Sequence, residues 1–464
     1  MKLKTFLTAA SLTACVGAHG ADGPKYIFYY IGDGMGLAPV MYAETYNRTV
    51  LQNDKPLLMM QFPVVAWCET WSYDNPVTDS AAAGTALSTG VKTRNNMLGM
   101  APDTTAVTSV ARQLKDDGWG VGIVTTVSAD DATPGAFYAH VAGRKQYYDI
   151  DIQAARSGYE IIAGAGLRGL KDKEGNPTDV EAVMRENGVQ IVRGPEGIAQ
   201  INSDRVLLLN PEGTPEWNVG YTIDSIPGVL TLPVIAETAL NQLERTSPDK
   251  FFLMVEGGNI DHALHANDGG AAIKEILNFN QALRLAYDFY LEHPDETLIV
   301  VTADHDTGGS AMVKRADGSK PDLSVFDWQK VSKEAFSDYC KSILKSRMNY
   351  RWEDMKQYLE ENLGLFSHIP VSAETEKALQ DKFDATFQLR NTADQKTLYA
   401  NFNSFAVDVF TLLNEAAGVR FTTTGHSGSP VPVFAVGVGS DAFKGRNNNR
   451  DIPAVLRRLT GLKN

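Results

Sequence analysis

The sequence is poor in cysteine: only Cys15, Cys68 and Cys340 occur among its 464 residues. Cysteines this few and this far apart do not make a disulfide framework. Cys68 lies in the apolar run 64–68, which is typical of a core strand, so we expect it to be a buried thiol. A hydrophobic content of 43% with 21% charged residues is typical of a globular protein with an ample core.

Positive charge is also in short supply. The chain has 43 lysines and arginines against 56 aspartates and glutamates, which gives a formal net charge of −13. Phosphate backbones repel an acidic surface, so we expect no nucleic acid as a binding partner. An acidic protein can still bind anions where metal ions or arginines reverse the local sign of the charge.

Long apolar runs are absent after the N-terminal segment, and no later stretch is long enough to form a transmembrane helix. The N-terminal segment begins with Lys2 and Lys4 and continues with apolar and small residues to Ala21. This pattern is typical of a secretory signal. We therefore divide the chain into a signal at 1–21 and a main domain at 22–464.

Two cleavage sites compete within the signal. Residues 18–21 suit ordinary signal peptidase, whereas Leu12-Thr13-Ala14-Cys15 resembles the bacterial lipobox, in which Cys15 is lipidated and becomes the first mature residue. The lipobox is slightly favoured. Either interpretation sends the chain across the inner membrane, and we expect a periplasmic protein or a lipoprotein anchored to the outer membrane.

The stretch 255–265 combines acidic, glycine and histidine residues after an apolar run, Phe251–Met254, that is typical of a buried strand. Glu256 is expected at the carboxyl end of that strand, followed by a glycine turn. If a helix begins near Asn259, Asp261 and His265 lie one turn apart on one face, where they can hold one metal ion. By itself, this pattern fits a chance strand–loop–helix junction equally well.

Acidic residues follow other predicted strands in the same way. Lys25–Ile31 is followed by Asp33, and Thr297–Thr302 is followed by Asp304-His305. A carboxylate at a strand end can be a ligand at the carboxyl edge of an α/β sheet, or merely part of a tight turn. The turn is favoured for Asp33 alone, but it explains the repeated pattern less well.

Four further positions carry polar groups near predicted element ends. Ser80 begins an alanine-rich helix, either as an ordinary residue near the cap or as a nucleophile that meets an anion at the helix N-terminus. No histidine base lies near it in sequence, so a nucleophilic Ser80 would need a metal ion. Asp131 and Thr133 follow the strand 121–127, and Pro134 suits the first turn of a helix. Arg144 comes about a helix length later, where a solvated helix-end cation is the usual interpretation.

The alternation of strands and helices predicts an α/β fold, a three-layer αβα sandwich with a large, mostly parallel central sheet. Residues 310–420 are rich in lysine and glutamate with helical periodicity, so we expect a mostly helical insertion that forms a crown or lid. The polar residues at strand ends, including His426 beside the strand 432–438, would gather at one edge of the sheet. Histidines with carboxylates suit zinc, and the oxygen groups of Asp33, Thr133 and Glu256 suit magnesium.

Taken together, these segments resemble the alkaline phosphatases. The matching stretches occur in the family's order and cover nearly all of the chain outside the signal and the 310–420 region; they are Asp33–Gly36, Thr78–Ala82, Asp131–Arg144, Glu256–His265, Asp304-His305 and Gly425-His426. Several independent motifs in order are far more specific than any one of them.

The resemblance implies two Zn²⁺ and one Mg²⁺ per subunit and a covalent phosphoserine intermediate on Ser80 in the hydrolysis of small-molecule phosphate monoesters. It assigns the residues as follows: Asp261, His265 and His426 to one zinc; Asp33, Asp304 and His305 to the second, with Ser80 reaching toward it; Thr133 and Glu256 to magnesium, with Asp33 bridging; Arg144 to the phosphoryl group; Asp131 to orienting Arg144; and His262 to tuning phosphate affinity. It also implies a homodimer. Two metal ions about 4 Å apart can stabilise the entering and leaving oxygens of an in-line displacement.

Relatives with other activities share this resemblance. A sulfatase needs a modified cysteine or serine followed by proline and arginine, whereas Ser80 is followed by three alanines. Phosphodiesterases usually have threonine in place of the serine and lack an arginine such as Arg144. A non-catalytic surface-binding relative is hard to reconcile with a complete ligand set.

Overall fold

The computed structural model describes residues 23–346, 350–390 and 393–462. The predicted signal and Cys15 lie outside these residues. Cys68 and Cys340 are buried free thiols, as predicted for Cys68. Within the described residues, no helix is both long and apolar enough to cross a membrane.

The centre of the molecule is one large sheet. The strands of this sheet are, in chain order, β1 (Tyr26–Ile31), β2 (Val64–Glu69), β3 (Gly120–Thr125), β4 (Ile161–Gly164), β5 (Val189–Arg193), β6 (Arg205–Leu209), β7 (Phe251–Glu256), β8 (Thr297–Thr302), β15 (Val431–Gly437) and β16 (Arg446–Asn448). Their spatial order is β16-β2-β15-β8-β1-β7-β3-β4-β6-β5. In this sheet β15 pairs antiparallel with both neighbours, and the other pairings are parallel.

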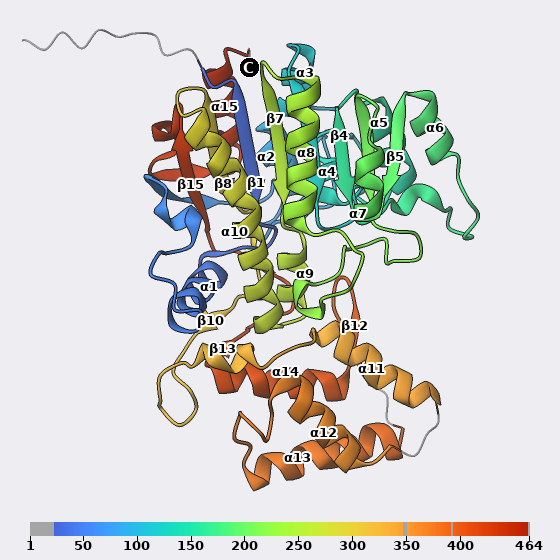
Figure 1. Ribbon diagram of the computed structural model, residues 1–464, viewed down its shortest axis with the longest axis vertical. Coiled ribbons are helices and arrows are strands. Elements are labelled where there is room, and N and C mark those ends of the chain that lie inside the picture. The colour runs from blue at the N-terminus through green and yellow to red at the C-terminus, as the bar shows by residue number, and fades with distance from the viewer. Residues whose placement is uncertain (1–22, 347–349, 391–392, 463–464) are drawn as a thin grey trace, which may run out of the picture.

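Helices cover the two faces of this sheet (Figure 1). The helices of the sheet region are α1 (Leu37–Thr49), α2 (Ser80–Thr89), α3 (Val110–Asp116), α4 (Ala132–Gly135), α5 (Tyr147–Arg156), α6 (Val180–Glu186), α7 (Gly194–Gly197), α8 (Leu232–Thr246), α9 (Asn259–His265), α10 (Gly269–Glu292) and α15 (Asp451–Thr460). Helices α8 and α10 lie together in front of the sheet, while α2 packs against α3, α4 and α15. The predicted α/β sandwich with a mostly parallel sheet is confirmed.

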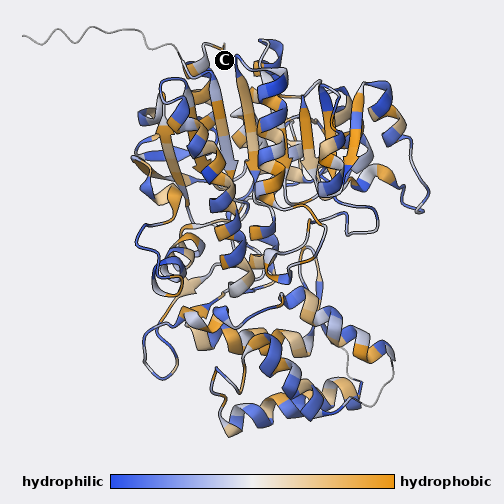
Figure 2. Cartoon of the chain, viewed as in Figure 1, coloured by the Kyte–Doolittle hydropathy of each residue, from blue (hydrophilic) through white to orange (hydrophobic). Residues whose placement is uncertain are grey.

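The central strands are buried because they are covered on both sides. Strands β3, β7 and β8 have no exposed residue, and their sequences are rich in Val, Ile, Leu and Phe without polar alternation. Figure 2 shows the same strands as the most hydrophobic part of the chain. Rings at the start of the sheet pack edge to face, among them Phe28 with Phe251 at a centroid distance of 5.5 Å.

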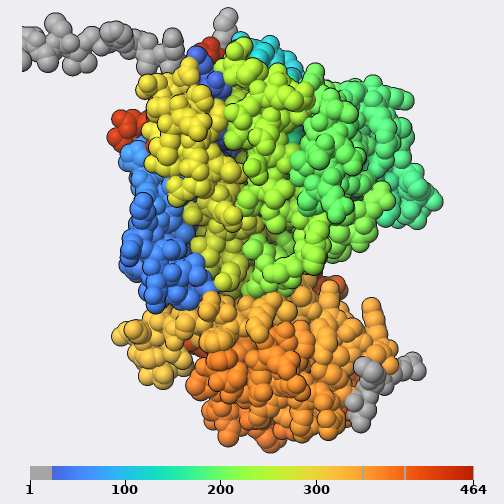
Figure 3. All heavy atoms as spheres, viewed as in Figure 1, coloured from blue at the N-terminus to red at the C-terminus, as the bar shows by residue number. Residues whose placement is uncertain are grey.

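The chain between β8 and β15 forms a second, mostly helical unit. Its helices are α11 (Lys333–Ser346), α12 (Trp352–Leu363), α13 (Ala373–Phe383) and α14 (Ser404–Ala417), and its short strands are β10 (Ala311–Met312) with β13 (Val419–Arg420) and β11 (Asp394–Lys396) with β12 (Asn401–Asn403). Figures 1 and 3 show this unit beneath the lower end of the sheet, the end at which α9 lies. It therefore lies on the side of the molecule where β1, β7 and β8 end.

Candidate active site

Four central strands end at one level, which gathers the residues that follow them. Ile31, the last residue of β1, pairs with Glu256 of β7 on one side and with Thr302 of β8 on the other. Glu256 in turn pairs with Thr125, the last residue of β3. The residues after these strand ends therefore meet at a single edge of the sheet, as ligand residues do in open α/β folds.

Asp261, His265 and His426 form one group of possible ligands. His265 Nε2 lies 3.2 Å from Asp261 Oδ2 and 3.1 Å from His426 Nε2, and Asp261 and His265 come from adjacent turns of α9. His426 belongs to β14 (His426–Ser427), which pairs with β9 (Asp306–Thr307). This short pairing brings His426 to the site from far along the chain.

The backbone fixes which nitrogen each of these two imidazoles presents. The Nδ1 of His265 contacts the Thr424 carbonyl oxygen, and the Nδ1 of His426 lies 2.8 Å from the Thr78 carbonyl oxygen. An Nδ1–H that donates to a carbonyl leaves Nε2 unprotonated and free to bind a metal. The two Nε2 atoms face each other at 3.1 Å, an arrangement that a cation between them would stabilise.

Asp33, Asp304 and His305 form a second group. His305 Nε2 lies 3.4 Å from Asp33 Oδ1 and 3.1 Å from Asp304 Oδ2. The Ser80 hydroxyl is 3.1 Å from the same nitrogen, although 225 positions separate the two residues in sequence. Ser80 is the first residue of α2, and Asp79 caps this helix by accepting a hydrogen bond from Ala82 N at 3.0 Å. The hydroxyl thus sits at a helix N-terminus, where negative charge is favoured.

Oxygen groups lie beside Asp33. Thr133 Oγ1 donates to Asp33 Oδ2 at 3.5 Å, and Thr125 donates its hydroxyl proton to Glu256. Glu256 and Thr133 are almost completely buried. This set of carboxylate and hydroxyl oxygens has the chemistry that magnesium prefers.

Arg144 is held by two acidic residues and is not solvated. Its Nη2 donates to Asp131 Oδ1 at 2.9 Å, and its Nη1 lies 3.5 Å from Asp79 Oδ2. The expected long helix before it was wrong: α4 ends at Gly135, and the chain then turns toward the site. The short helix leaves Arg144 in a loop that the two carboxylates orient.

His262 packs against the ring of Tyr399. The ring centroids are 3.9 Å apart, and the Tyr399 ring also meets His265 edge to face at 5.2 Å. Tyr399 lies between β11 and β12, so the helical unit contributes one side chain to the site. No motif marked this position in the sequence, because the contact joins residues that are far apart.

The buried charges of the site have strongly shifted pKa values. Burial, then Asp304 and Asp261, raise the pKa of Asp33 well above its ordinary value, and burial raises that of Glu256 to about 8. Burial lowers the pKa of His262 to about 4 and, with the charge of His305, that of His426 to about 3. Each shift disfavours the charged form, so the two carboxylates need a compensating partner when they are ionised.

The unpartnered atoms of the site fit divalent cations. One carboxylate oxygen of each of four buried acids has no hydrogen-bond partner among the described residues; these are Asp33 Oδ1, Glu256 Oε1, Asp261 Oδ2 and Asp304 Oδ2. A buried polar atom without a partner is costly unless another group, such as a metal ion, satisfies it. In each of two groups of residues, three ligand atoms lie within 4.8 Å of one another. The groups are Asp261, His305 and His426, and Asp33, Asp304 and His305.

Two glycines make room for this arrangement. Gly34 has φ +68°, and a Cβ there would lie 2.7 Å from Asp261 Oδ1 and 2.8 Å from Thr307 Oγ1. Gly257 does not have a positive φ, but a Cβ there would lie 2.8 Å from Phe279 Cδ2. Close packing, and not a left-handed backbone, therefore requires glycine after Glu256.

Thr307 belongs to the site and Arg168 lies at its border, although neither was singled out from the sequence. Thr307 donates its hydroxyl proton to Asp261 Oδ1 and lies 3.2 Å from His305 Nδ1. Arg168 follows β4 by four residues. The available signal in the sequence was that Arg168 follows a strand of the sheet, but no chemical motif follows that strand.

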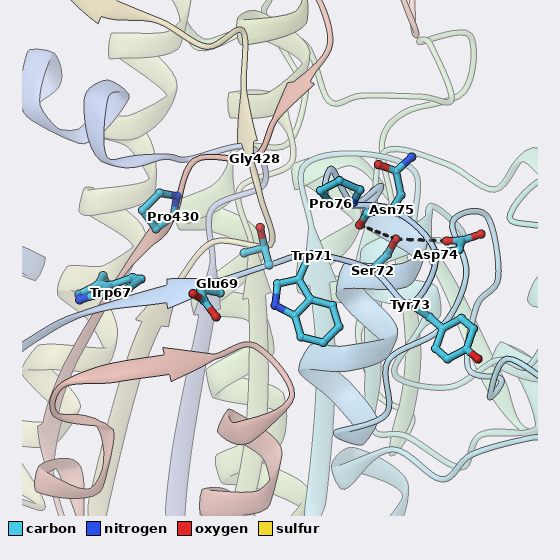
Figure 4. Close-up of a pocket in the computed structure, with 11 residues that line it drawn as sticks. Trp67, Glu69, Trp71, Ser72, Tyr73, Asp74, Asn75, Pro76, Gly428 and Pro430 are labelled. Carbon is cyan, nitrogen blue, oxygen red and sulfur yellow. Dashed lines mark hydrogen bonds between the residues drawn. The ribbon is translucent and has the colours of Figure 1, made fainter.

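A separate pocket lies on the outer side of β2. It has a volume of about 580 Å³, and Trp67, Trp71 and Tyr73 line it with exposed fractions of 41, 38 and 58% (Figure 4). None of the predicted ligands lines it. Together with Val65, exposed to 62%, these rings make an apolar surface of the kind that often forms contacts with partners.

Comparisons with known proteins identify relatives of the whole chain. A family model described as alkaline phosphatase matches residues 24–168 and 221–462. Alkaline phosphatase 4 of Bacillus subtilis is 28% identical over 450 residues, which cover 94% of this chain and 88% of that protein. The crystal structure of a cold-active alkaline phosphatase from Shewanella sp. has a TM-score of 0.78 at 24% identity, covering 94% of this chain and 99% of the other.

A mutant of the alkaline phosphatase from the Antarctic bacterium TAB5, with Mg bound in its M3 site, has the same fold. Its TM-score is 0.65 at 24% identity, and the match covers 96% of this chain and 100% of that one.

Proposed function

The chain belongs to the alkaline phosphatase family, metal-dependent enzymes that hydrolyse phosphate monoesters, and on this premise we propose that it works through a phosphoserine intermediate on Ser80 at a site for two zinc ions and one magnesium ion. The observation that carries this proposal is the Ser80 hydroxyl, at a helix N-terminus and 3.1 Å from His305, in contact with a buried group of carboxylates and imidazoles.

Three sets of residues would hold the metals. Asp261, His265 and His426 would bind one zinc ion, Asp33, Asp304 and His305 would bind the second, and Thr133 and Glu256 would bind magnesium with Asp33 between the sites. The unpartnered carboxylate oxygens and the unprotonated Nε2 atoms support this assignment. Metal ions bound there supply Lewis-acid stabilisation of negative charge on the reacting oxygens.

Ser80 carries the covalent step. Its Oγ attacks phosphorus, the bond from Oγ to phosphorus forms, and the bond from phosphorus to the leaving oxygen breaks. The serine hydroxyl loses its proton, and the leaving oxygen gains one to become an alcohol. Water then attacks the phosphoserine, releases inorganic phosphate and returns the hydroxyl to Ser80. The helix dipole of α2 favours the negative charge at this position throughout.

Arg144 binds the phosphoryl group. Its planar guanidinium can donate two parallel hydrogen bonds to non-bridging phosphate oxygens. Asp131 keeps the guanidinium aimed at the site, and the Arg144 charge is the main influence that keeps the pKa of Asp131 low, at about 2 despite burial. Asp131 therefore stays ionised at any working pH of the enzyme.

Replacing the nucleophile tests the proposal directly. We expect Ser80→Ala to fold, to keep its metals and to lose turnover of p-nitrophenyl phosphate by more than about 10³-fold. Ser88→Ala, in the same helix and equally buried, is the matched control and should keep its turnover. Unchanged turnover in Ser80→Ala would rule out Ser80 as the nucleophile.

A substrate panel separates the proposal from related chemistries. Rates on a phosphate monoester, a phosphate diester and a sulfate ester should rank the monoester first, because its dianion offers two negative charges to Arg144 and the proposed metal ions, whereas the diester and the sulfate each offer one. A preference for the diester or the sulfate would contradict the proposed reaction.

We also propose that the helical unit shapes the mouth of the site through Tyr399. Its ring covers His262 and the edge of His265, so it limits how a leaving group can approach. Tyr399→Ala should change the ranking of monoesters that differ only in leaving-group size. An identical ranking in this variant and the wild type would refute this role.

A homodimer, export and a lipid anchor at Cys15 complete the proposal. The exposed apolar surface of Val65, Trp67 and Tyr73 supports self-association. Light scattering on the wild type and on Trp67→Glu tests this, since a dimer that uses this surface should dissociate in the variant. Mass spectrometry of the mature N-terminus decides between lipidation of Cys15 and cleavage near Ala21.

A further inference from the structure

A pocket with a basic wall opens beside Arg144. It has a volume of about 840 Å³ and lies between residues 145–149 and 168–174. Four cations line it, Lys145, Arg168, Lys171 and Lys173, in a chain whose formal net charge is −13. Such a local reversal of sign is what anion binding by an acidic protein requires.

Two of the three carboxylates in the same wall, those of Asp149 and Asp172, accept local hydrogen bonds; the third belongs to Glu174. Asp172 accepts hydrogen bonds from Glu174 N at 3.0 Å and from Asn176 Nδ2 at 3.0 Å, and Asp149 accepts one from Gln146 at 3.2 Å. Lys171 lies 3.6 Å from Glu216. In the described part of the chain, Lys145 and Lys173 form no ion pair, and the four cations outnumber the three carboxylates that line the pocket.

Arg168 is a cation of the pocket that contacts within the protein hold in place. Its Nη1 donates to the Tyr147 hydroxyl at 2.6 Å, and its guanidinium lies 4.9 Å from the centre of the Tyr147 ring. Its backbone N–H donates to Asp130 Oδ2 at 2.6 Å, as that of Gly169 does at 3.2 Å. These bonds fix the loop while leaving most of the guanidinium donors unused, since Arg168 has no ion pair among residues 23–346, 350–390 and 393–462.

The pocket borders the phosphate clamp. Lys145 directly follows Arg144, and Asp130, which holds the Arg168 loop, directly precedes Asp131. After Arg144, Arg168 is the next charge that lowers the pKa of Asp131, and its charge is also felt by His262. Arg168 therefore stands at the border between the site and the pocket.

Building on the proposed function, we propose that the Arg168 pocket binds a second phosphate group of the substrate while the first phosphoryl group lies at Ser80 and Arg144. The preferred substrates are then phosphate monoesters whose alcohol carries another phosphate. A guanidinium with free donors at a fixed position is suited to this, because its fork matches two phosphate oxygens. The lysines around it add positive charge without requiring one geometry.

Alkanediol bisphosphates of two to six carbons, each compared with the monophosphate of the same diol, measure this preference. We expect kcat/KM to favour the bisphosphate about 10- to 100-fold at the best chain length, as one charge-assisted contact would produce. Arg168→Met should reduce the ratio to about the statistical value of two, with the change in KM and not in kcat. Arg168→Lys should keep part of the preference.

The matched control is Arg156→Met, which removes the same charge from the far end of α5, where the side chain is exposed. It should leave the ratio as in the wild type. In the wild type, added salt should also reduce the ratio, which keeps the proposal testable if Arg168→Met does not fold.

Three outcomes overturn the proposal: no bisphosphate preference at any length, equal losses on both compounds in Arg168→Met, or an equal effect of Arg156→Met. Each of these leaves phosphomonoester hydrolysis standing. Failure to hydrolyse either compound would instead contradict the proposed function, and the second phosphate site with it.

Discussion

Thr307→Val should weaken the metal site without disturbing the fold. Thr307 is completely buried and donates its hydroxyl proton to Asp261, which is also completely buried. Valine has almost the same shape but cannot donate, so the Asp261 oxygen loses a hydrogen bond to a charged group. Such a bond is worth about 1.5–3 kcal/mol, which corresponds to roughly 10- to 100-fold in zinc affinity.

The neighbouring strand β8 offers a matched control. Thr297, at the start of β8, is equally buried, and its hydroxyl has no hydrogen-bond partner in the described residues. Thr297→Val therefore removes the same atom without breaking a bond to a ligand, and it should leave stability unchanged or slightly increased.

Zinc competition with a chromogenic chelator measures the affinity of both variants, and p-nitrophenyl phosphate turnover at saturating zinc measures the remaining effect on catalysis. Thr307→Val should require more free zinc for half-maximal activity, whereas Thr297→Val should match the wild type. Equal zinc affinities in all three proteins would show that Thr307 does not position Asp261.

Three further predictions concern stability and packing. Burial raises the pKa of Glu275 from 4.5 to about 7, so the stability that its protonated form contributes is present below about pH 4.5 and is lost as the pH rises through 7. Glu275→Gln should therefore raise the free energy of unfolding by about 3 kcal/mol at pH 9 and by little at pH 4.5. An equal change at both pH values in urea titrations would contradict this. Removing bound metal with EDTA should lower Tm, because the metal stabilises the folded chain by about 3 kcal/mol when free metal is at 100 times its Kd. Calorimetry showing an unchanged Tm would argue against a metal among the buried carboxylates. Gly257→Val should cost about 1–3 kcal/mol by crowding Phe279 and should lower activity as well, so a fully stable variant would show that this contact can relax.

Local patterns predicted the elements whose sequences agree with their surroundings. The strand 297–302 and the helix beginning near Asn259 have the predicted bounds, because a β-branched apolar run and a glycine-to-helix transition each favour one structure. The helix expected after Pro134 ends after one turn, since tertiary contacts such as Tyr138 with the Ala129 carbonyl oxygen replace helical bonds. Propensity alone does not reveal such contacts.

The site was predictable to the extent that it follows strand ends. Asp33, Glu256 and Asp304 could be placed at one edge because parallel strands end at one level. The Ser80 contact with His305 could not be found, because only the packing of α2 against the sheet edge brings these residues together. Tyr399 depends on a hairpin of the helical unit, which shares no local pattern with the site.

The pairing of β14 with β9 brings His426 to the proposed metal ligands, of which Asp33 is the first along the chain. The ribosome therefore makes the first and last members of the site at opposite ends of translation, and a nascent chain interrupted before residue 426 holds an incomplete set. A metal ion captured early by such a fragment would be bound without the imidazole of His426, which the finished protein supplies. Activity in a cell extract would then report finished molecules only, so truncated products escape an enzymatic assay and must be sought with antibodies against the early part of the chain.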